Sequence, residues 1–133
     1  MKITQDAAAC AAYPELKRVH VRRGADVPLL GAQGVIGDGG NSGFQAINLA
    51  AQFGASRILL VGFDMSLARG VHWHGLHPRG LNNPSPANIA RWRRVLDAAA
   101  PAYAAAGVEV INCSAESALT AYPKRSLREA LAC

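Results

Sequence analysis

The sequence has few cysteines and no long apolar segment. Its cysteines, Cys10, Cys113 and Cys133, lie far apart and lack the Cys-x-x-Cys spacing of a metal site. No apolar run approaches the length of a bilayer crossing, and residues 1–13 lack the basic segment and apolar core of a signal peptide. We therefore expect reduced thiols, a cytoplasmic location and no membrane partner.

Charged residues are also scarce, at 17% of the 133 residues, whereas half of the chain is hydrophobic. A chain of this length and hydropathy folds around one core without a metal or a disulfide, so residues 1–133 are expected to form a single domain. The net charge of +5 favours an anionic ligand such as a phosphate or a nucleotide. The basic residues are dispersed along the chain, and nucleic-acid binding is therefore not expected.

Strand patterns alternate with helix patterns along the chain. Strands are expected at residues 2–4, 19–21, 58–61 and 108–111. Helices are expected after Asp6, from Asn41 or Ser42 through Phe53, from about Ile89 to Tyr103 with an interruption or bend near Pro101, and over 117–121 and 127–132. The stretches 23–40 and 65–86 are expected to be long connections, which are usually functional or mobile.

The segment from Ile58 to Val61 is an unbroken apolar run, which is typical of a parallel strand covered on both faces. Strands that alternate with helices favour parallel pairing through right-handed crossovers. The sequence therefore predicts an α/β fold, with a small three-layer Rossmann-like parallel sheet and helices on both of its faces. In that architecture ligands bind beyond the carboxyl ends of the strands.

The first candidate site is a glycine-rich stretch at the start of the helix expected from residue 41 or 42. It contains Gly39, Gly40, Asn41, Ser42 and Gly43. Glycines let the backbone approach a ligand closely, and the free amides of a helix start attract a phosphate or a carboxylate. Alternatively, the glycines only form a tight turn and Ser42 only caps the helix. The stretch is neither a Walker loop nor a Rossmann fingerprint, because the lysine and the spacing are absent.

The second candidate site follows the strand expected at 58–61. Gly62 ends that strand and Asp64 lies just beyond it. A carboxylate at this position points into the crevice where a ribose hydroxyl, a base or a metal would bind. The alternative is that Asp64 accepts hydrogen bonds from the backbone amides of its own loop.

The third candidate site is a loop with His72, His74 and His77. Alternate residues of an extended segment face the same side, so His72 and His74 could bind a metal with Asp64 or His77 as the third ligand. One histidine could instead act as a general acid or base near neutral pH. A polar loop that packs its rings against Trp73 would have the same sequence.

Part of the chain resembles a family of glycosyltransferases. The resemblance is to a segment shared by bacterial sialyltransferases that use CMP-sialic acid and by glycosyltransferase-like proteins of the motility-accessory-factor type. In this chain it covers residues 41–43, 46–50, Gly54 and 58–64. The segments 107–114 and 117–119 are similar to the ending of that family. The His-Trp-His-Gly loop and the Leu-Asn-Asn-Pro stretch after it are similar to phage and prophage proteins that carry this domain.

The resemblance implies a nucleotide-sugar donor as ligand and assigns roles to the candidate residues. It implies that Ser42 and Gly43 lie by the donor phosphate and that Gly62 and Asp64 lie by the nucleotide. It also implies a histidine as catalytic base.

In the loop that contains His72, His74 and His77, the candidates for the catalytic base are His74 and His77. The family tyrosines that assist the departing phosphate have no counterpart, because Met65 and Ser66 occupy the corresponding positions. The amino-terminal half of the family domain has no counterpart before Lys2 either, so the chain resembles the carboxyl-terminal half of a larger domain.

Three functions follow from these features. The first is a phage-derived, sialyltransferase-like domain that binds a nucleotide sugar, whether or not it retains activity. The second is a non-enzymatic phage assembly or interaction module, in which a second copy covers an open sheet edge to form a homo-oligomer. The third is a metal-dependent phosphoester hydrolase built on the histidine loop and Asp64.

Overall fold

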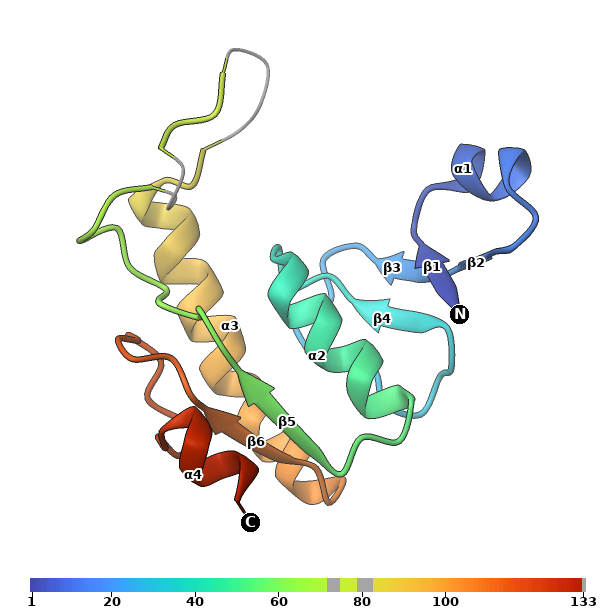
Figure 1. Cartoon of the computed structure of the whole chain (residues 1–133). Coiled ribbons are helices and arrows are strands. Elements are labelled where there is room, and N and C mark those ends of the chain that lie inside the picture. Colours follow the sequence, from blue (N-terminus) through green and yellow to red (C-terminus); the bar gives the residue numbers. More distant parts are fainter. Residues whose placement is uncertain (72–74, 79–82, 133) are drawn as a thin grey trace.

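The computed structural model describes residues 1–71, 75–78 and 83–132 (Figure 1). Along these residues the elements are β1 (Lys2–Thr4), α1 (Ala7–Ala12), β2 (Leu16–Arg18), β3 (His20–Arg22), β4 (Val35–Gly37), α2 (Ser42–Gln52), β5 (Arg57–Leu60), α3 (Pro86–Ala105), β6 (Glu109–Asn112) and α4 (Leu127–Leu131). Within this part of the chain, no helix is both long enough and apolar enough to span a bilayer.

The described strands form parallel pairs, which confirms the expected α/β class. Strand β1 pairs with β2, β3 with β4, and β5 with β6, and each pair is a separate two-stranded sheet. Figure 1 shows β1 to β4 on one side of α2, and β5 and β6 with α3 and α4 on the other. The expected single sheet is therefore divided into small sheets in the part of the chain that the structure describes.

Side chains of α2 occupy the outer edge of β4, and the β3–β4 sheet therefore ends at this strand. The backbone N–H of Gly37 donates to Asn48 Oδ1 over 3.0 Å, and Gln52 Nε2 donates to the carbonyl of Val35 over 2.7 Å. These backbone groups point away from β3 and would be the partners of a further strand. The two amide side chains take the place of that strand.

A strand was expected at 19–21, and the structure has two three-residue strands around that stretch, of which β3 begins one residue later than expected. Val19 lies between β2 and β3, and its N–H donates to the carbonyl of Thr4 over 2.9 Å. The next N–H, of His20, donates to the carbonyl of Gly34 over 2.8 Å. Successive N–H groups of a strand point to opposite sides, so one extended segment pairs first with β1 and then with β4.

Two expectations about the elements were wrong, and a third, the interruption or bend near Pro101, was wrong as to the interruption. Strand β4 lies within the stretch 23–40, which was expected to be a connection without a strand. Helix α3 runs without interruption through Pro101, since a proline removes only one helical hydrogen bond and the buried Ala99 and Tyr103 hold both sides of it against the core. The segment 117–121 is not helical.

The segment 117–121 is not helical because tertiary hydrogen bonds use its polar groups. The Ser117 hydroxyl donates to the carbonyl of Phe63 over 2.6 Å, and the N–H of Ala118 donates to the carbonyl of Asp64 over 2.8 Å. The local pattern that predicted a helix does not contain these partners, which come from a distant part of the chain.

The apolar core lies around α3. It joins side chains of α2, β5, α3, β6 and the segment before α4, namely Phe44, Ile47, Leu60, Val95, Leu96, Ala99, Tyr103, Val108, Val110, Leu119 and Tyr122. Strand β5 was expected to be covered on both faces, but only Leu60 of this strand is buried, and Val61 beyond its end is 59% exposed. The carboxyl end of β5 therefore leads directly to the surface.

Candidate functional site

The candidate site is a cavity of about 760 Å³ beyond the carboxyl ends of β5 and β6. The segment that follows β5 and the segment that follows β6 line it together. Gly62 and Asp64, two of the residues singled out in the sequence, are in its wall. Its other polar side chains come from Ser66, Arg69, Cys113, Ser114, Glu116 and Ser117. The cavity thus occupies the position at which parallel α/β proteins bind ligands.

Hydrogen bonds join the two segments and hold the wall of the cavity. The N–H of Phe63 donates to the Ser114 hydroxyl over 2.9 Å, and this hydroxyl is 3.4 Å from the carbonyl of Leu60. The Ser117 hydroxyl and the N–H of Ala118 donate to the carbonyls of Phe63 and Asp64, respectively. The backbone around Asp64 is therefore positioned by the segment after β6.

The Asp64 side chain itself is left open. Asp64 is exposed, and its carboxylate has no hydrogen-bond or ion-pair partner within the described ranges. The alternative role of Asp64 was to accept hydrogen bonds from the backbone amides of its own loop. Within the described ranges, these amides do not donate to its carboxylate. An unpaired carboxylate on the wall of a cavity can accept hydrogen bonds from the hydroxyl or amino groups of a ligand.

The loop that carries Asp64 has an unusual backbone. Gly62 has a φ of 74°, and Met65 has a φ of 49°, a left-handed conformation that a residue with a Cβ rarely adopts. Such a conformation costs of the order of 1–3 kcal/mol and persists only where the surroundings impose it. Met65 packs against the apolar core, and this packing holds the turn that directs Asp64 outward.

An ion pair crosses the cavity between the two segments. The Arg69 guanidinium binds the Glu116 carboxylate, and the two side chains are 79% and 62% exposed. Exposed ion pairs are weak, so a ligand anion can compete for the guanidinium at little cost. Arg69 is therefore a cation in the described wall of the cavity that is accessible to an anionic ligand.

The glycine-rich stretch before α2 packs closely. Gly39 has a φ of 56°, and a Cβ there would lie 2.3 Å from the Phe44 ring. Gly40 has a φ of 63°, and a Cβ there would lie 2.8 Å from the movable Arg91 guanidinium. Asn41 caps α2, since its Oδ1 accepts from the N–H of Phe44 over 3.1 Å, while Ser42 is exposed. The turn and its packing thus require glycine at both positions.

The cations beside this stretch are already paired with acids. Arg91 Nη2 lies 2.8 Å from Asp26 Oδ1, and this hydrogen bond raises the pKa of Arg91 above its ordinary value. Asp38 pairs with Arg23 over 3.5 Å. The carboxylates offset the positive charge near the helix start, which weakens its attraction for an anion.

The first two candidate sites meet at one aromatic ring. Phe63 Cε1 lies 2.8 Å from the position that a Cβ on Gly43 would occupy, so Phe63 packs directly on the start of α2. Gly43 therefore adjoins the loop that holds Gly62 and Asp64. None of the residues 39–43 is in the wall of the 760 Å³ cavity, and the structure brings the two stretches together through packing.

The histidine loop is described only in part. His77 is half-buried, and its N–H donates to Asn83 Oδ1 over 2.9 Å. It does not line the cavity around Asp64. His72 and His74 lie outside the described residues, as does any metal site that includes them. Within residues 1–71, 75–78 and 83–132, no three histidine, cysteine or acidic side chains are grouped closely enough to hold a metal ion.

The sequence did not single out the polar residues after β6 as part of a site. Ser114 and Ser117 organise the cavity, yet they attracted attention only through the family resemblance. The signal was present, because residues just beyond a parallel strand lie at the ligand-binding edge of a sheet. The same reasoning that selected Asp64 after β5 would have selected Ser114 after β6 once the two strands were known to be neighbours.

No protein-family model matches the chain, and neither does any curated protein or solved structure. The family resemblance therefore rests on the sequence motifs alone.

Proposed function

We propose that this chain is a sialyltransferase-like domain that binds a nucleotide sugar in the cavity beyond β5 and β6. The observation that carries the proposal is the carboxylate of Asp64, which has no partner among the described residues and lies in a cavity at the carboxyl ends of two parallel strands. This is where a nucleotide ribose or base would meet the protein in a parallel α/β fold. A cavity of about 760 Å³ is within the size range of small-molecule sites.

Each part of the ligand has a counterpart in the cavity. The Asp64 carboxylate would accept hydrogen bonds from ribose hydroxyls or from the exocyclic amino group of a base. Arg69 would exchange its exposed pairing with Glu116 for a ligand phosphate. The net charge of +5 would favour the approach of such an anion.

The proposal extends to the fold. The parallel pairs would be parts of a Rossmann-like arrangement, with β5, α3 and β6 as one strand–helix–strand unit. Two observations support this: every described pair is parallel, and the cavity follows the ends of the pair that α3 connects. Sugar transfer would also need a base, for which the resemblance offers His74 and His77.

Isothermal titration with CMP, UDP and GDP sugars tests the binding. We expect one of them to bind, and we expect Asp64→Asn to weaken that binding about tenfold or more, as for the loss of a hydrogen bond to a charged group. Glu15→Gln is the matched control, because it removes an exposed carboxylate next to β2 with the same change in net charge. Hydrolysis or transfer of the bound sugar would then show whether the domain is active.

Absence of binding by all of these nucleotides, with the protein folded by circular dichroism, would refute the proposal. Equal affinity of Asp64→Asn and the unchanged chain would refute the role of Asp64.

One observation favours the non-enzymatic alternative. Within the described residues, β5 pairs only with β6, and its other edge has no strand partner. An unpaired edge next to the exposed Val61 is a surface that a second copy could extend. Sedimentation velocity distinguishes the cases: a dimer that dissociates on substitution of Val61→Lys supports this alternative, and a monomer at high concentration excludes it.

A further inference from the structure

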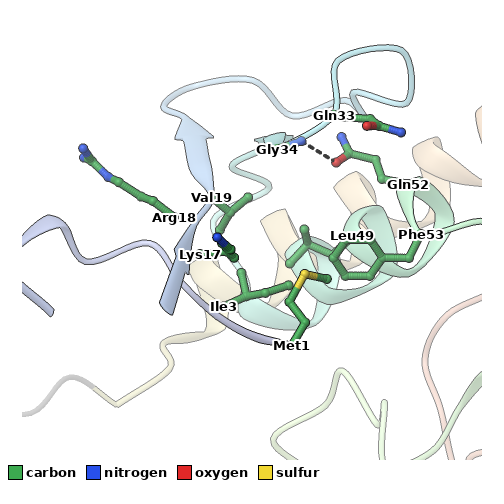
Figure 2. A pocket seen from close by; sticks show the side chains of 10 residues that line it. All are labelled: Met1, Ile3, Lys17, Arg18, Val19, Gln33, Gly34, Leu49, Gln52 and Phe53. Carbon is green, nitrogen blue, oxygen red and sulfur yellow. Dashed lines mark hydrogen bonds between the residues drawn. The ribbon is translucent and has the colours of Figure 1, made fainter. Parts of the chain in front are cut away.

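A second cavity, of about 290 Å³, lies between the β1–β2 pair and the carboxyl-terminal part of α2 (Figure 2). It shares no residue with the cavity beyond β5 and β6. Its ligand therefore does not depend on the function proposed above.

The wall of this cavity is mostly apolar. Ile3 pairs in register with Lys17, so the side chains of Ile3, Lys17 and Val19 share one face of the strands. That face lies over α2, which contributes Leu49 and the ring of Phe53 (Figure 2). Phe53 remains 58% exposed. Exposed apolar side chains that converge on a hollow mark a binding surface more often than isolated ones do.

The amide of Gln52 in this wall is fully used by the protein. The two hydrogens of its Nε2 are shared among the carbonyls of Leu29, Ala32 and Val35, and its Oε1 accepts from the N–H of Gly34 over 3.1 Å. Gln52 is therefore part of the scaffold and is not available to a ligand.

Lys17 is different. Its amine has no hydrogen-bond or ion-pair partner in the described part of the chain, and the cavity wall contains no acidic residue. Figure 2 shows the Lys17 side chain beside Ile3 and Val19 at the cavity, while the guanidinium of the neighbouring Arg18 extends away from it. An ammonium group at the rim of an apolar cavity is complementary to an anion with an apolar body.

We propose that this cavity binds a small apolar molecule with one anionic group, such as a medium-chain or aromatic carboxylate. The apolar part contacts Ile3, Leu49 and Phe53, and the carboxylate binds the Lys17 amine. The cavity is at the lower end of the size range of small-molecule sites, which limits the ligand to about the size of octanoate.

Titration of the ¹⁵N-labelled chain with octanoate, followed by NMR, tests the proposal. Any tag is placed at the carboxyl end, because Met1 is in the cavity wall. We expect saturable shifts of the amides of Ile3, Gly34 and Leu49. The neutral 1-octanol should bind the same residues about three- to tenfold more weakly, since it lacks the charge-assisted contact.

Two neighbouring substitutions provide a matched comparison. Lys17→Gln should reduce the affinity for octanoate to that for 1-octanol, whereas Arg18→Gln should change it less than about twofold, because its guanidinium extends away from the cavity. Phe53→Ala should weaken the binding of octanoate and 1-octanol alike, since it removes apolar contact from both.

Three results would overturn the proposal. The first is the absence of saturable shifts at the cavity. The second is an equal effect of Lys17→Gln and Arg18→Gln, which would indicate a general effect of charge. The third is a shift of the same amides on dilution of the protein alone, which would show that a second copy fills the cavity.

Discussion

The two sides of α2 are held by different interactions. On one side, the amide side chains of Asn48 and Gln52 bind the backbone of β4 and of the loop before it. On the other side, Phe44 and Ile47 enter the apolar core with β5, α3 and β6. One short helix thus combines a polar attachment with an apolar one.

The polar attachment centres on a residue that is fully buried. Asn48 is 0% exposed, accepts from the N–H groups of Leu29 and Gly37, and donates to the carbonyl of Leu29 over 3.1 Å. Residues 1–40 contribute only Val19 and Ile36 as buried apolar side chains. A small β region can therefore be fixed to a helix with little apolar burial, provided that every buried amide group is paired.

The largest expected effect is on the apolar side. Leu96 of α3 is 0% exposed, and Leu96→Ala should lower the free energy of unfolding by about 3–4 kcal/mol, through lost transfer energy and the cavity left behind. Leu131→Ala, at a side chain that is 68% exposed, is the control and should change it by less than about 0.5 kcal/mol. Urea denaturation measures both, and a loss below about 1 kcal/mol for Leu96→Ala would contradict the assigned core.

The next effect is on the polar side. Asn48→Ala should lower the free energy of unfolding by about 2–3 kcal/mol, because it leaves the N–H groups of Leu29 and Gly37 without partners. Asn88→Ala, at an exposed position of α3, is the matched control.

Hydrogen exchange sharpens this second comparison. With Asn48→Ala, the amides of Leu29 and Gly37 should lose more protection than those of Val110 and Ile111 in β6. An equal loss in all four amides would mean that Asn48 does not stabilise the β4 side of α2 more than the β6 side.

A smaller effect concerns two buried tyrosines in the apolar region. The Tyr122 hydroxyl donates to the carbonyl of Leu96 over 2.6 Å, whereas the Tyr103 hydroxyl has no hydrogen-bond partner in the part of the chain that the structure describes. Burial raises the pKa of both phenols above the ordinary value, at which a tyrosine is already neutral near pH 7. Tyr122→Phe should destabilise by about 1 kcal/mol and Tyr103→Phe should be neutral or stabilising. Thermal melts measure the difference, and equal losses would contradict the assigned pairing.

The smallest effect is at the surface, at the start of α4. Ser126 and Glu129 form a capping box, and the hydrogen bonds from Ser126 hold the pKa of Glu129 below its ordinary value. A lowered pKa contributes stability above the pKa of the unfolded chain, near 4.5, and this contribution is lost as the pH falls through the folded value. Glu129→Gln should therefore remove this contribution at neutral pH. It should also slightly reduce the dependence of the free energy of unfolding on pH in the acid range.

Periodicity and capping residues predicted the elements of the apolar region well. The helix that begins at Ser42 and the strands at 57–60 and 109–112 lie within a residue or two of their expected positions. Their apolar runs are long enough to specify the element locally. Strand β4 was missed because it has only Val35 and Ile36 as apolar residues, and its pairing depends on contacts with β3.

The candidate site, like the strands, was predicted only in part. Asp64 could be found from its place after an apolar strand, and the cavity lies at that place. The second wall, with Ser114 and Ser117, was not singled out, since the position of Ser114 after β6 indicates the same site only when β5 and β6 are known to be neighbours.

Local patterns decided where α2, α3, β5 and β6 form and which end of β5 carries a polar loop, because apolar spacing and capping act between residues close in the chain. Tertiary contacts alone decided that α2 amides would cover the edge of β4 and that hydroxyls after β6 would position Asp64. The physical reason is that a side-chain amide or hydroxyl has many possible partners, and only the packed fold brings one of them within hydrogen-bond distance.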